Sequence, residues 1–218
     1  AVQGKGPSAQ GIAEGLWLFS LGIWKKVIVA EAFGGGADWG WANLPALNST
    51  TALAVTLSYT LQLYFDFSGY TDMARGIGKM LGVTLPENFD VPYQALTIRG
   101  FWKGWHMTMT RFFTRYLYIP LGGSRRGLPR TCVNTLVIFL ASGLWHGADW
   151  SFVLWGGIHG FYQVIEDVTE KFRNKLWKAM NVKTDCFSWK FLQMAVTFVL
   201  VVFAWIFFRA DSIRDALG

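Results

Sequence analysis

The sequence predicts an all-α fold: a polytopic bundle of transmembrane helices with short interfacial or re-entrant helices between them. Of the 218 residues, 52% are hydrophobic and only 16% are charged, whereas soluble domains carry about 25% charged residues. The apolar residues also gather in charge-poor windows, and about 20 mostly apolar residues suffice to cross a bilayer. Composition and patterning together therefore indicate a membrane protein rather than a soluble domain.

The first two apolar windows differ in how they would meet the membrane. Gly15–Ala30 is short and carries Lys25 and Lys26, so it is either a tilted span with snorkelling lysines or an interfacial helix. Trp39–Phe65 is long enough to cross, and we expect it to do so from about Ala46, because residues 43–45 have the composition of a turn.

Three further windows lie in the second half of the chain. Thr131–Ala148 and Trp150–Ile165 contain no Asp, Glu, Lys or Arg. Phe191–Phe208 is the most uniformly apolar of the windows. We expect Phe191–Phe208 to be the clearest membrane span.

The segment between these windows alternates turns with helix. Two prolines between Leu85 and Tyr93 predict an ordered turn. Ile98–Tyr118 has a helical pattern, in which Trp102, His106, Thr110 and Phe113 share one face while Arg111 and Arg115 share another. A proline and a glycine pair then break the helix within Ile119–Gly127. The two arginines of that turn allow a weakly indicated phosphate site, although a plain basic turn is the simpler interpretation.

The net charge of +6 is concentrated in two basic stretches. One runs from Arg99 to Arg130 and the other from Lys171 to Lys183. Their position next to apolar windows predicts contact with the cytoplasmic side or with anionic headgroups of a lipid bilayer. Nucleic-acid binding is disfavoured, because the basic residues alternate with Trp, Phe and Tyr and form no separate domain.

His146 is the residue that most needs an explanation, because the stretch around it, Thr131–Ala148, contains no Asp, Glu, Lys or Arg. Titratable residues are costly in hydrocarbon, and those found there tend to be functional. A second histidine, His106, lies in a basic, tryptophan-rich block.

Acyl transfer to a hydroxyl needs a base near the alcohol proton and a group that stabilises the oxyanion. The two histidines therefore suggest an acyl-transfer enzyme built inside a membrane, with His146 as the general base. His106 would orient the donor or the hydroxyl, or donate a hydrogen bond to the oxyanion.

Simpler interpretations of these residues stay open at this point. Trp145 and His146 could pack between helices, where Ser142, Gly143 and Gly147 permit close approach. His159 lies in another charge-free run, where a hydrogen-bonded packing role is the commoner one. A transporter could use the same histidines to relay protons, although no inverted repeat is visible. We expect no metal site, because the surroundings of the histidines lack ligand-like carboxylates.

Asp66 and Asp72 stand where the second window gives way to small and polar residues. They could pair with Arg75 or Lys79, orient a histidine, or cap the next helix. The structural and catalytic interpretations have similar weight.

Six sequence blocks carry a resemblance to a known family. In chain order they are Asp66–Ala74, Leu85–Phe89, Phe101–His106, Tyr116–Gly123, Gly143–Gly147 and Trp155–Gly160. Together they resemble the membrane-bound O-acyltransferase family. Trp205–Ala210 is similar to a late span of the bacterial branch that contains the alginate O-acetyltransferase membrane subunit.

The resemblance implies roles for several residues. His146 takes the position of the catalytic histidine embedded in the membrane, and His106 that of the second active-site residue. Supporting or substrate-binding roles are expected for Asp66, Asp72, Trp102, Trp105, Trp145, Arg115 and His159. The chain would be a single partial catalytic domain, 1–218, lacking N-terminal spans and the extreme C-terminus of its longer relatives.

Two departures from the family pattern stand close to these residues. Many relatives have an Arg-Asp pair before Tyr-Leu-Tyr, where this chain has Thr114 and Arg115. His106 follows Lys103, Gly104 and Trp105, where relatives often have two arginines and a tryptophan, so the local positive charge is lower here. If the acidic residue of the relatives orients or gates a substrate, another residue must do so in this chain.

The implied activity is O-acylation in the bacterial cytoplasmic (inner) membrane. An acyl group, most simply acetyl, would pass from a cytoplasmic thioester, either acetyl-CoA or a carrier-protein thioester, across the membrane for O-acetylation of an exopolysaccharide such as alginate. A periplasmic partner of the hydrolase type would complete the transfer to the polysaccharide, and no tightly bound cofactor is expected. The alternatives are D-alanyl transfer to teichoic acid and the non-enzymatic transporter.

Overall fold

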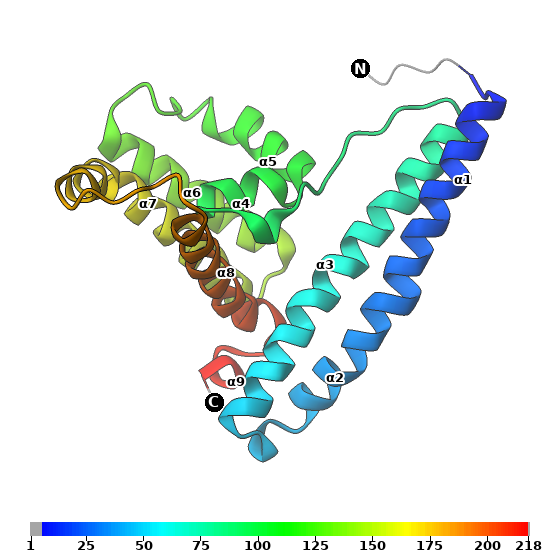
Figure 1. Cartoon of the computed structure of the whole chain (residues 1–218), viewed down its shortest axis with the longest axis horizontal. Coiled ribbons are helices and arrows are strands. Elements are labelled where there is room, and N and C mark those ends of the chain that lie inside the picture. The colour runs from blue at the N-terminus through cyan, green and yellow to red at the C-terminus, as the bar shows by residue number, and fades with distance from the viewer. Residues whose placement is uncertain (1–5, 218) are drawn as a thin grey trace. The chain divides into compact units, whose positions relative to one another are not determined.

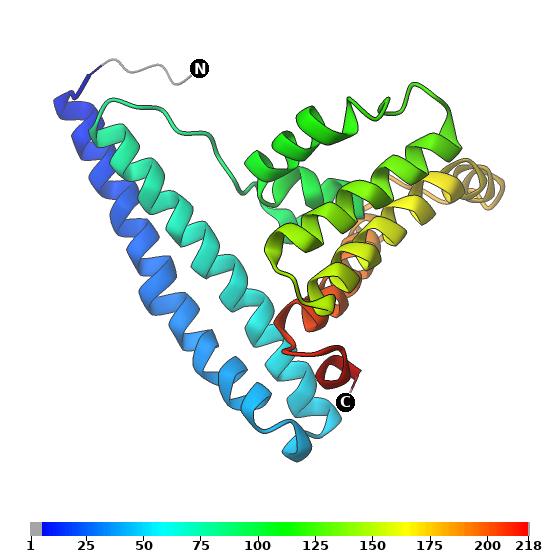
Figure 2. The same ribbon diagram turned by 180° about the vertical axis from the view of Figure 1, so that it is seen from behind.

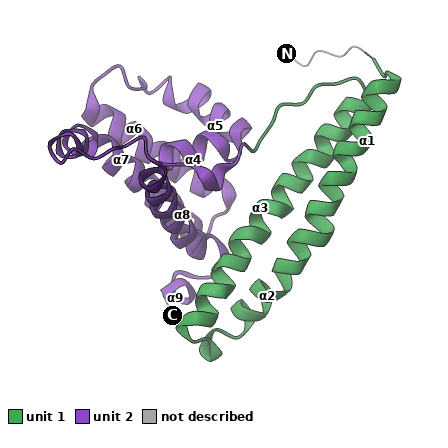
Figure 3. Cartoon of the chain, viewed as in Figure 1, with its two compact units in different colours: residues 1–89 green, residues 90–218 purple. Residues whose placement is uncertain are grey.

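The computed structural model describes residues 6–217. The chain divides into two compact units, residues 1–89 and residues 90–218, coloured separately in Figure 3. Every regular element among the described residues is helical, which confirms the all-α prediction.

Unit 1 is a long helical hairpin (Figure 1). Its first arm joins α1 (Ala9–Ile23), a π-helical segment (Trp24–Ala30) and α2 (Glu31–Ala42) without a break. A short 3₁₀ turn at Leu44–Ala46 follows, as residues 43–45 predicted. The second arm is α3 (Ser49–Met80), where Asn48 accepts hydrogen bonds from the backbone N–H groups of Thr50 and Thr51. This cap explains why the helix starts after the predicted entry point at Ala46.

Glycines set the close approach of α1 to α3. A Cβ built on Gly22 would lie 2.6 Å from the carbonyl oxygen of Gly69, and one on Gly69 would lie 2.7 Å from that of Gly22. The pair Gly15 and Gly76 repeats this arrangement, at 2.6 and 2.7 Å. Small residues at such contacts let helix backbones meet directly, as membrane helices commonly do.

Unit 2 contains the remaining helices (Figures 1 and 2). A 3₁₀ turn at Pro92–Gln94 precedes α4 (Ile98–Gly104), α5 (Met107–Phe113) and a π-helical turn at Thr114–Tyr118. Three long helices follow, α6 (Leu128–His146), α7 (Trp150–Ala179) and α8 (Phe187–Arg209), and then the short α9 (Ile213–Leu217).

The neighbouring helices α6 and α7 also pack through glycine (Figure 1). A Cβ on Gly156 would lie 2.2 Å from the carbonyl oxygen of Phe139, and one on Gly143 would lie 2.3 Å from that of Phe152. The prediction that Gly143 and its neighbours permit close helix approach is therefore confirmed.

Two helices of the described part, α6 and α8, are long and apolar enough to cross a membrane. They correspond to the predicted windows Thr131–Ala148 and Phe191–Phe208. The helices α3 and α7 are longer, with 32 and 30 residues, but they do not reach the same apolar composition. The apolar windows Trp39–Phe65 and Trp150–Ile165 are thus only parts of helical regions that continue into polar sequence.

The prediction of one helix over Ile98–Tyr118 is wrong, because the chain breaks between α4 and α5. Gly104 lies so close to Asp90 that a Cβ would be 2.4 Å from the Asp90 carbonyl oxygen. The N–H of Asp90 donates to the carbonyl oxygen of Gly104 at 2.9 Å, which diverts that carbonyl from helical pairing. Trp105 is then extended and His106 left-handed.

The two predicted irregular segments are confirmed. Residues 83–91 contain no helix, and Val91 adopts a left-handed conformation before the 3₁₀ turn. Between the π-helical turn and α6, the glycines 122, 123 and 127 have positive φ. Asn134 donates from its amide to the carbonyl oxygen of Gly123 at 2.9 Å, which ties the turn to α6.

Candidate active site

His106 occupies an unusual backbone position between α4 and α5. Its φ of 45° and ψ of 53° place it in the left-handed region, where few residues other than glycine are found. Such conformations cost free energy and persist where the surrounding structure enforces them, often at functional sites. The break of the helix thereby gives His106 a direction that a continuous helix would not.

Trp145 brings His106 and His146 together. Its ring centroid lies 6.3 Å from that of His106 and 4.9 Å from that of His146. α6 ends at His146, so this ring stands at the helix terminus. Trp145 itself is 61% exposed, and both histidines are partly buried.

An aromatic wall holds His146 on its other side. The centroids of Trp155 on α7 and Phe208 on α8 lie 5.2 and 5.1 Å from its ring. Both contacts are edge-on, the arrangement that aromatic rings favour. Three long helices therefore meet at this half-buried imidazole.

Burial lowers the pKa of His106 to about 4, because water is removed from around the ring. Its imidazole is therefore neutral at pH 7 and can accept a proton or a hydrogen bond. This protonation state suits a group that orients a hydroxyl or a donor.

His159 lies deeper than the other two histidines and is completely buried. Its Nδ1 accepts a hydrogen bond from Nε1–H of Trp102 at 3.2 Å, so a neutral ring carries its proton on Nε2. Nε2 is buried and has no hydrogen-bond partner among the described residues. Trp155 contacts both His159 and His146, with its ring centroid 5.3 Å from that of His159 and 5.2 Å from that of His146.

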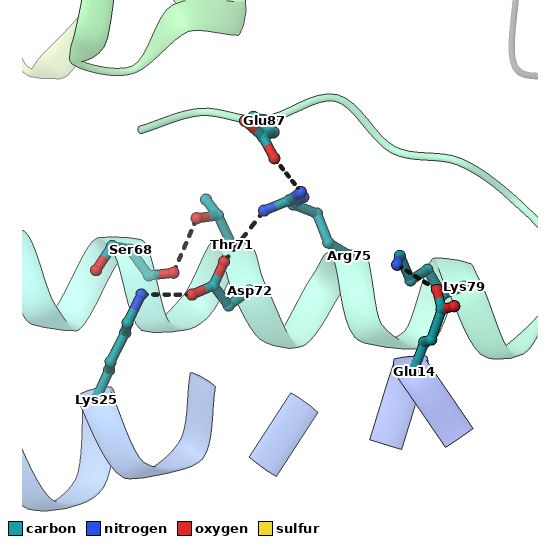
Figure 4. Close-up of polar contacts among 8 residues, drawn as sticks. All are labelled: Glu14, Lys25, Ser68, Thr71, Asp72, Arg75, Lys79 and Glu87. Carbon is teal, nitrogen blue, oxygen red and sulfur yellow. Dashed lines mark hydrogen bonds and ion pairs between the residues drawn. The ribbon is translucent and has the colours of Figure 1, made fainter. Parts of the chain in front are cut away.

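Asp66 and Asp72 both form ion pairs within unit 1, and those of Asp72 are drawn in Figure 4. Lys25 donates to the Asp72 carboxylate at 2.6 Å, and Arg75 reaches it at 3.4 Å. Lys26 pairs with Asp66. The lysines of the Gly15–Ala30 window are thus ion-paired across the hairpin, an arrangement that the sequence did not predict. Of the predicted partners, Arg75 does pair with Asp72, whereas Lys79 pairs with Glu14 instead.

The remaining predicted residues divide between core and surface. Trp105 is buried, with its ring centroid 5.4 Å from that of Phe101 and 5.0 Å from that of Trp205. Arg115 is exposed on the π-helical turn, with its guanidinium 5.7 Å from the ring centroid of Tyr116. Trp105 therefore supports the segment that carries His106, while Arg115 is open to solvent or headgroups.

A cavity of about 440 Å³ lies between α4, α5, α6 and α7. Three of the four residues predicted to share a face, Trp102, Thr110 and Phe113, line it. His106, the fourth, does not, because the helix break turns it away. The wall also includes Lys103, and Arg99, which is paired with Asp167 of α7. The helical spacing of Trp102, Thr110 and Phe113 was the feature of the sequence that could have indicated this cavity.

Two residues of this cavity wall lie close in the sequence to the two histidines. They are Ser142, one helical turn before His146, and Met109, which follows His106 in α5. The two contact each other, with Ser142 Oγ 4.0 Å from Met109 Sδ.

Among the described residues every regular element is α-, 3₁₀- or π-helical, and α6 and α8 are long and apolar enough to cross a membrane. The model of the membrane-bound O-acyltransferase family matches residues 15–212, and the chain belongs to this family. The resemblance found in its sequence blocks is thereby confirmed.

Several curated proteins are similar to this chain. A peptidoglycan O-acetyltransferase of Helicobacter pylori is 42% identical over 212 residues, which are 95% of this chain and 38% of that protein. A probable alginate O-acetylase of Pseudomonas aeruginosa is 39% identical over 206 residues, or 94% of this chain and 37% of that protein. A teichoic acid D-alanyltransferase of Bacillus subtilis is 28% identical over 177 residues, or 76% and 44%. The chain spans less than half the length of these relatives.

Proposed function

We propose that the protein is a membrane-embedded O-acyltransferase that moves an acetyl group from a cytoplasmic thioester for O-acetylation of a polysaccharide. The observation that carries the proposal is the pairing of His106 and His146 around Trp145, at 6.3 and 4.9 Å, in a chain of this family. Membership of the family supplies the reaction class, and the histidine pair supplies the groups that the reaction needs.

His146 is the general base in this mechanism. It takes the proton of the acceptor hydroxyl while the oxygen attacks the thioester carbonyl carbon. The tetrahedral intermediate then expels the thiolate, the C–S bond breaks, and the proton passes from His146 to the leaving sulfur. The acyl group moves directly to oxygen.

His106 positions the reactants. Its left-handed backbone and the packing of the preceding Trp105 hold the imidazole in one direction. A neutral imidazole can donate a hydrogen bond to the developing oxyanion or accept one from the hydroxyl. Fixing such a group in advance lowers the barrier, because no reorganisation is needed during the reaction.

The 440 Å³ cavity is suited to the donor. Lys103 and the ion-paired Arg99 provide positive charge for a phosphate-bearing carrier, either coenzyme A or a carrier-protein prosthetic arm. Apolar residues of α5 and α6, such as Phe113 and Ile138, line the remainder. An acyl-thioester is bound here as substrate, and the chemistry uses no tightly bound cofactor.

The acceptor is a hydroxyl of a cell-envelope polysaccharide, an exopolysaccharide such as alginate. Support comes from the identities of 39–42% to proteins named for O-acetylation of alginate and peptidoglycan, against 28% to a teichoic acid D-alanyltransferase. The protein works in the bacterial cytoplasmic membrane, as part of a catalytic membrane domain. A periplasmic hydrolase-type partner places the group on the polysaccharide.

The test is the O-acetyl content of envelope polysaccharides in cells that carry the full-length protein. His146→Ala should abolish the ester at a membrane abundance matched to wild type. Leu144→Ala, on the same helix and 61% exposed, is the control and should retain it. Full acetylation in the His146→Ala cells would refute the base assignment and favour proton transport or packing instead.

A further inference from the structure

A second cavity, of about 450 Å³, lies between α7 and α8. We call it the α7–α8 cavity. Its walls are mostly apolar and include Leu96, Ile98, Ile165, Leu192, Val196 and Leu200. None of these residues takes part in the proposed acyl transfer, so the cavity needs an explanation of its own.

Two buried donors line this cavity without an acceptor. Nε of Arg173 and Nε1 of Trp189 are both buried and have no hydrogen-bond partner among the described residues. Leaving such donors unpaired inside a protein is costly, and a guanidinium is more costly still. The pair therefore calls for an acceptor that carries negative charge.

The surrounding contacts hold both donors in place. Arg173 donates from its NH2 group to the backbone carbonyl of Glu166 at 3.1 Å, and its guanidinium carbon lies 5.5 Å from the ring centroid of Trp177. The ring of Trp177 lies 5.2 Å from that of Trp189, edge to face. The donors thus belong to one packed cluster.

Among the described residues, the cavity wall includes one carboxylate, and its hydrogen bonds are made with groups other than the two donors. Glu166 accepts hydrogen bonds from the backbone N–H groups of Ile98 and Arg99, at 2.6 and 3.2 Å. These bonds hold its charge at the start of α4. Its negative charge would weaken the binding of an anion nearby, so the bound anion must lie closer to the guanidinium of Arg173 than to Glu166.

The position of the cavity along α8 indicates the kind of anion. Trp189 lies in the first turn of α8, a candidate membrane span, and tryptophan is enriched at the headgroup level of such spans. Lys171, Lys175 and Lys178 are exposed on the adjoining part of α7 and attract anionic headgroups. Leu192, Val196 and Leu200 continue the apolar wall along α8 from there.

We propose that the α7–α8 cavity binds an anionic phospholipid. Its phosphodiester accepts hydrogen bonds from Arg173 and Trp189, and an acyl chain lies along the apolar wall of α8. The site is independent of the proposed transferase reaction, because it uses neither the histidines nor the 440 Å³ cavity.

The test is native mass spectrometry of the full-length protein in detergent, mixed with phosphatidylglycerol or with phosphatidylcholine. Wild type should retain phosphatidylglycerol in preference to phosphatidylcholine. Arg173→Gln and Trp189→Phe should each retain about tenfold less, as expected for the loss of a charge-assisted hydrogen bond. Lys178→Gln removes an exposed charge from the same helix and should stay within about twofold of wild type.

Two further comparisons decide the assignment. Trp189→Phe keeps the aromatic packing and removes only the N–H, so it remains informative if Arg173→Gln is unstable. Excess inorganic phosphate should leave the lipid bound, because the apolar wall contributes to binding. Equal retention of the two lipids by wild type, unchanged retention in Trp189→Phe, or displacement by phosphate would overturn the proposal.

Discussion

His106 shows how a single residue acquires its chemistry from the backbone around it. Its left-handed conformation follows from the break at Gly104, and burial then holds its imidazole neutral. Asparagine tolerates the same backbone region better than most residues and does not titrate. Exchanging the histidine for asparagine thus isolates the effect of its proton.

The pKa of His106 predicts how the stability of the protein depends on pH. It is about 4 in the folded chain and about 6.5 in the unfolded chain. Between these values the unfolded state binds the proton and the folded state does not, so the free energy of unfolding falls as the pH falls. The unfolding temperature of His106→Asn should therefore rise relative to wild type as the pH decreases from 6.5 to 4. A difference that stays constant over this range would contradict the assignment.

The hydrogen bond from Trp102 to His159 predicts coupling between these residues. His159→Phe leaves the indole N–H buried without an acceptor and should destabilise the protein by about 1–3 kcal/mol. Trp102→Phe removes the donor as well, so the double variant should lose less than the sum of the single losses. Thermal unfolding of the four proteins measures the coupling, and strictly additive losses would show that the bond contributes nothing.

At the scale of elements, glycine decides how closely the helices pack. α1 and α3 meet through two glycine pairs, and α6 meets α7 through Gly143 and Gly156. The second contact matters for the site, because α6 carries His146 and α7 carries the wall against which its ring packs. A shift of one helix against the other would therefore move His146 relative to this wall.

Adjacent glycines of α7 provide a matched test of this packing. A Cβ on Gly156 would lie 2.2 Å from a backbone oxygen, whereas one on Gly157 would lie 3.6 Å from a flexible leucine methyl. Gly156→Ala should therefore destabilise the protein by about 1–3 kcal/mol. Gly157→Ala should be neutral or stabilising by up to about 1 kcal/mol, because alanine favours the helix. Tryptophan fluorescence during thermal unfolding measures both, and equal effects would argue against the close contact.

At the scale of the whole molecule, the bilayer acts as solvent for the apolar helices. α8 presents several large apolar side chains on its surface, among them Val199 at 63% and Phe191 at 55% exposure. Such exposure would be unfavourable in water and is expected of a helix that faces lipid or neighbouring spans. The family assignment agrees with this surface.

The depth of α8 in the membrane predicts the effect of an added charge. Val199→Arg, near the middle of the helix, should lower insertion by about 2.5–3.5 kcal/mol. Phe187→Arg, at the first residue of the same helix, should have little effect because its side chain reaches the interface. Membrane-bound protein after alkaline extraction measures this, and equal recovery of the two variants would contradict a span at α8.

Composition and periodicity by themselves determined the all-α class, the apolar windows that lie in α6 and α8, and the turns at 43–45 and 119–127. These properties follow from each residue and its near neighbours, so they can be predicted without knowing the fold. The same local pattern favoured a continuous helix at Ile98–Tyr118, and there the structure differs.

Tertiary contacts decided the rest, because they join residues that lie far apart in the chain. The carbonyl oxygen of Gly104 accepts a hydrogen bond from the backbone N–H of Asp90. This contact breaks the helix, and the ring of His106 then lies near that of Trp145. Lys25 pairs with Asp72, and Trp102 with His159, across 47 and 57 positions. Helical periodicity can place side chains on one face of one helix, but the partner of that face depends on how the whole chain packs.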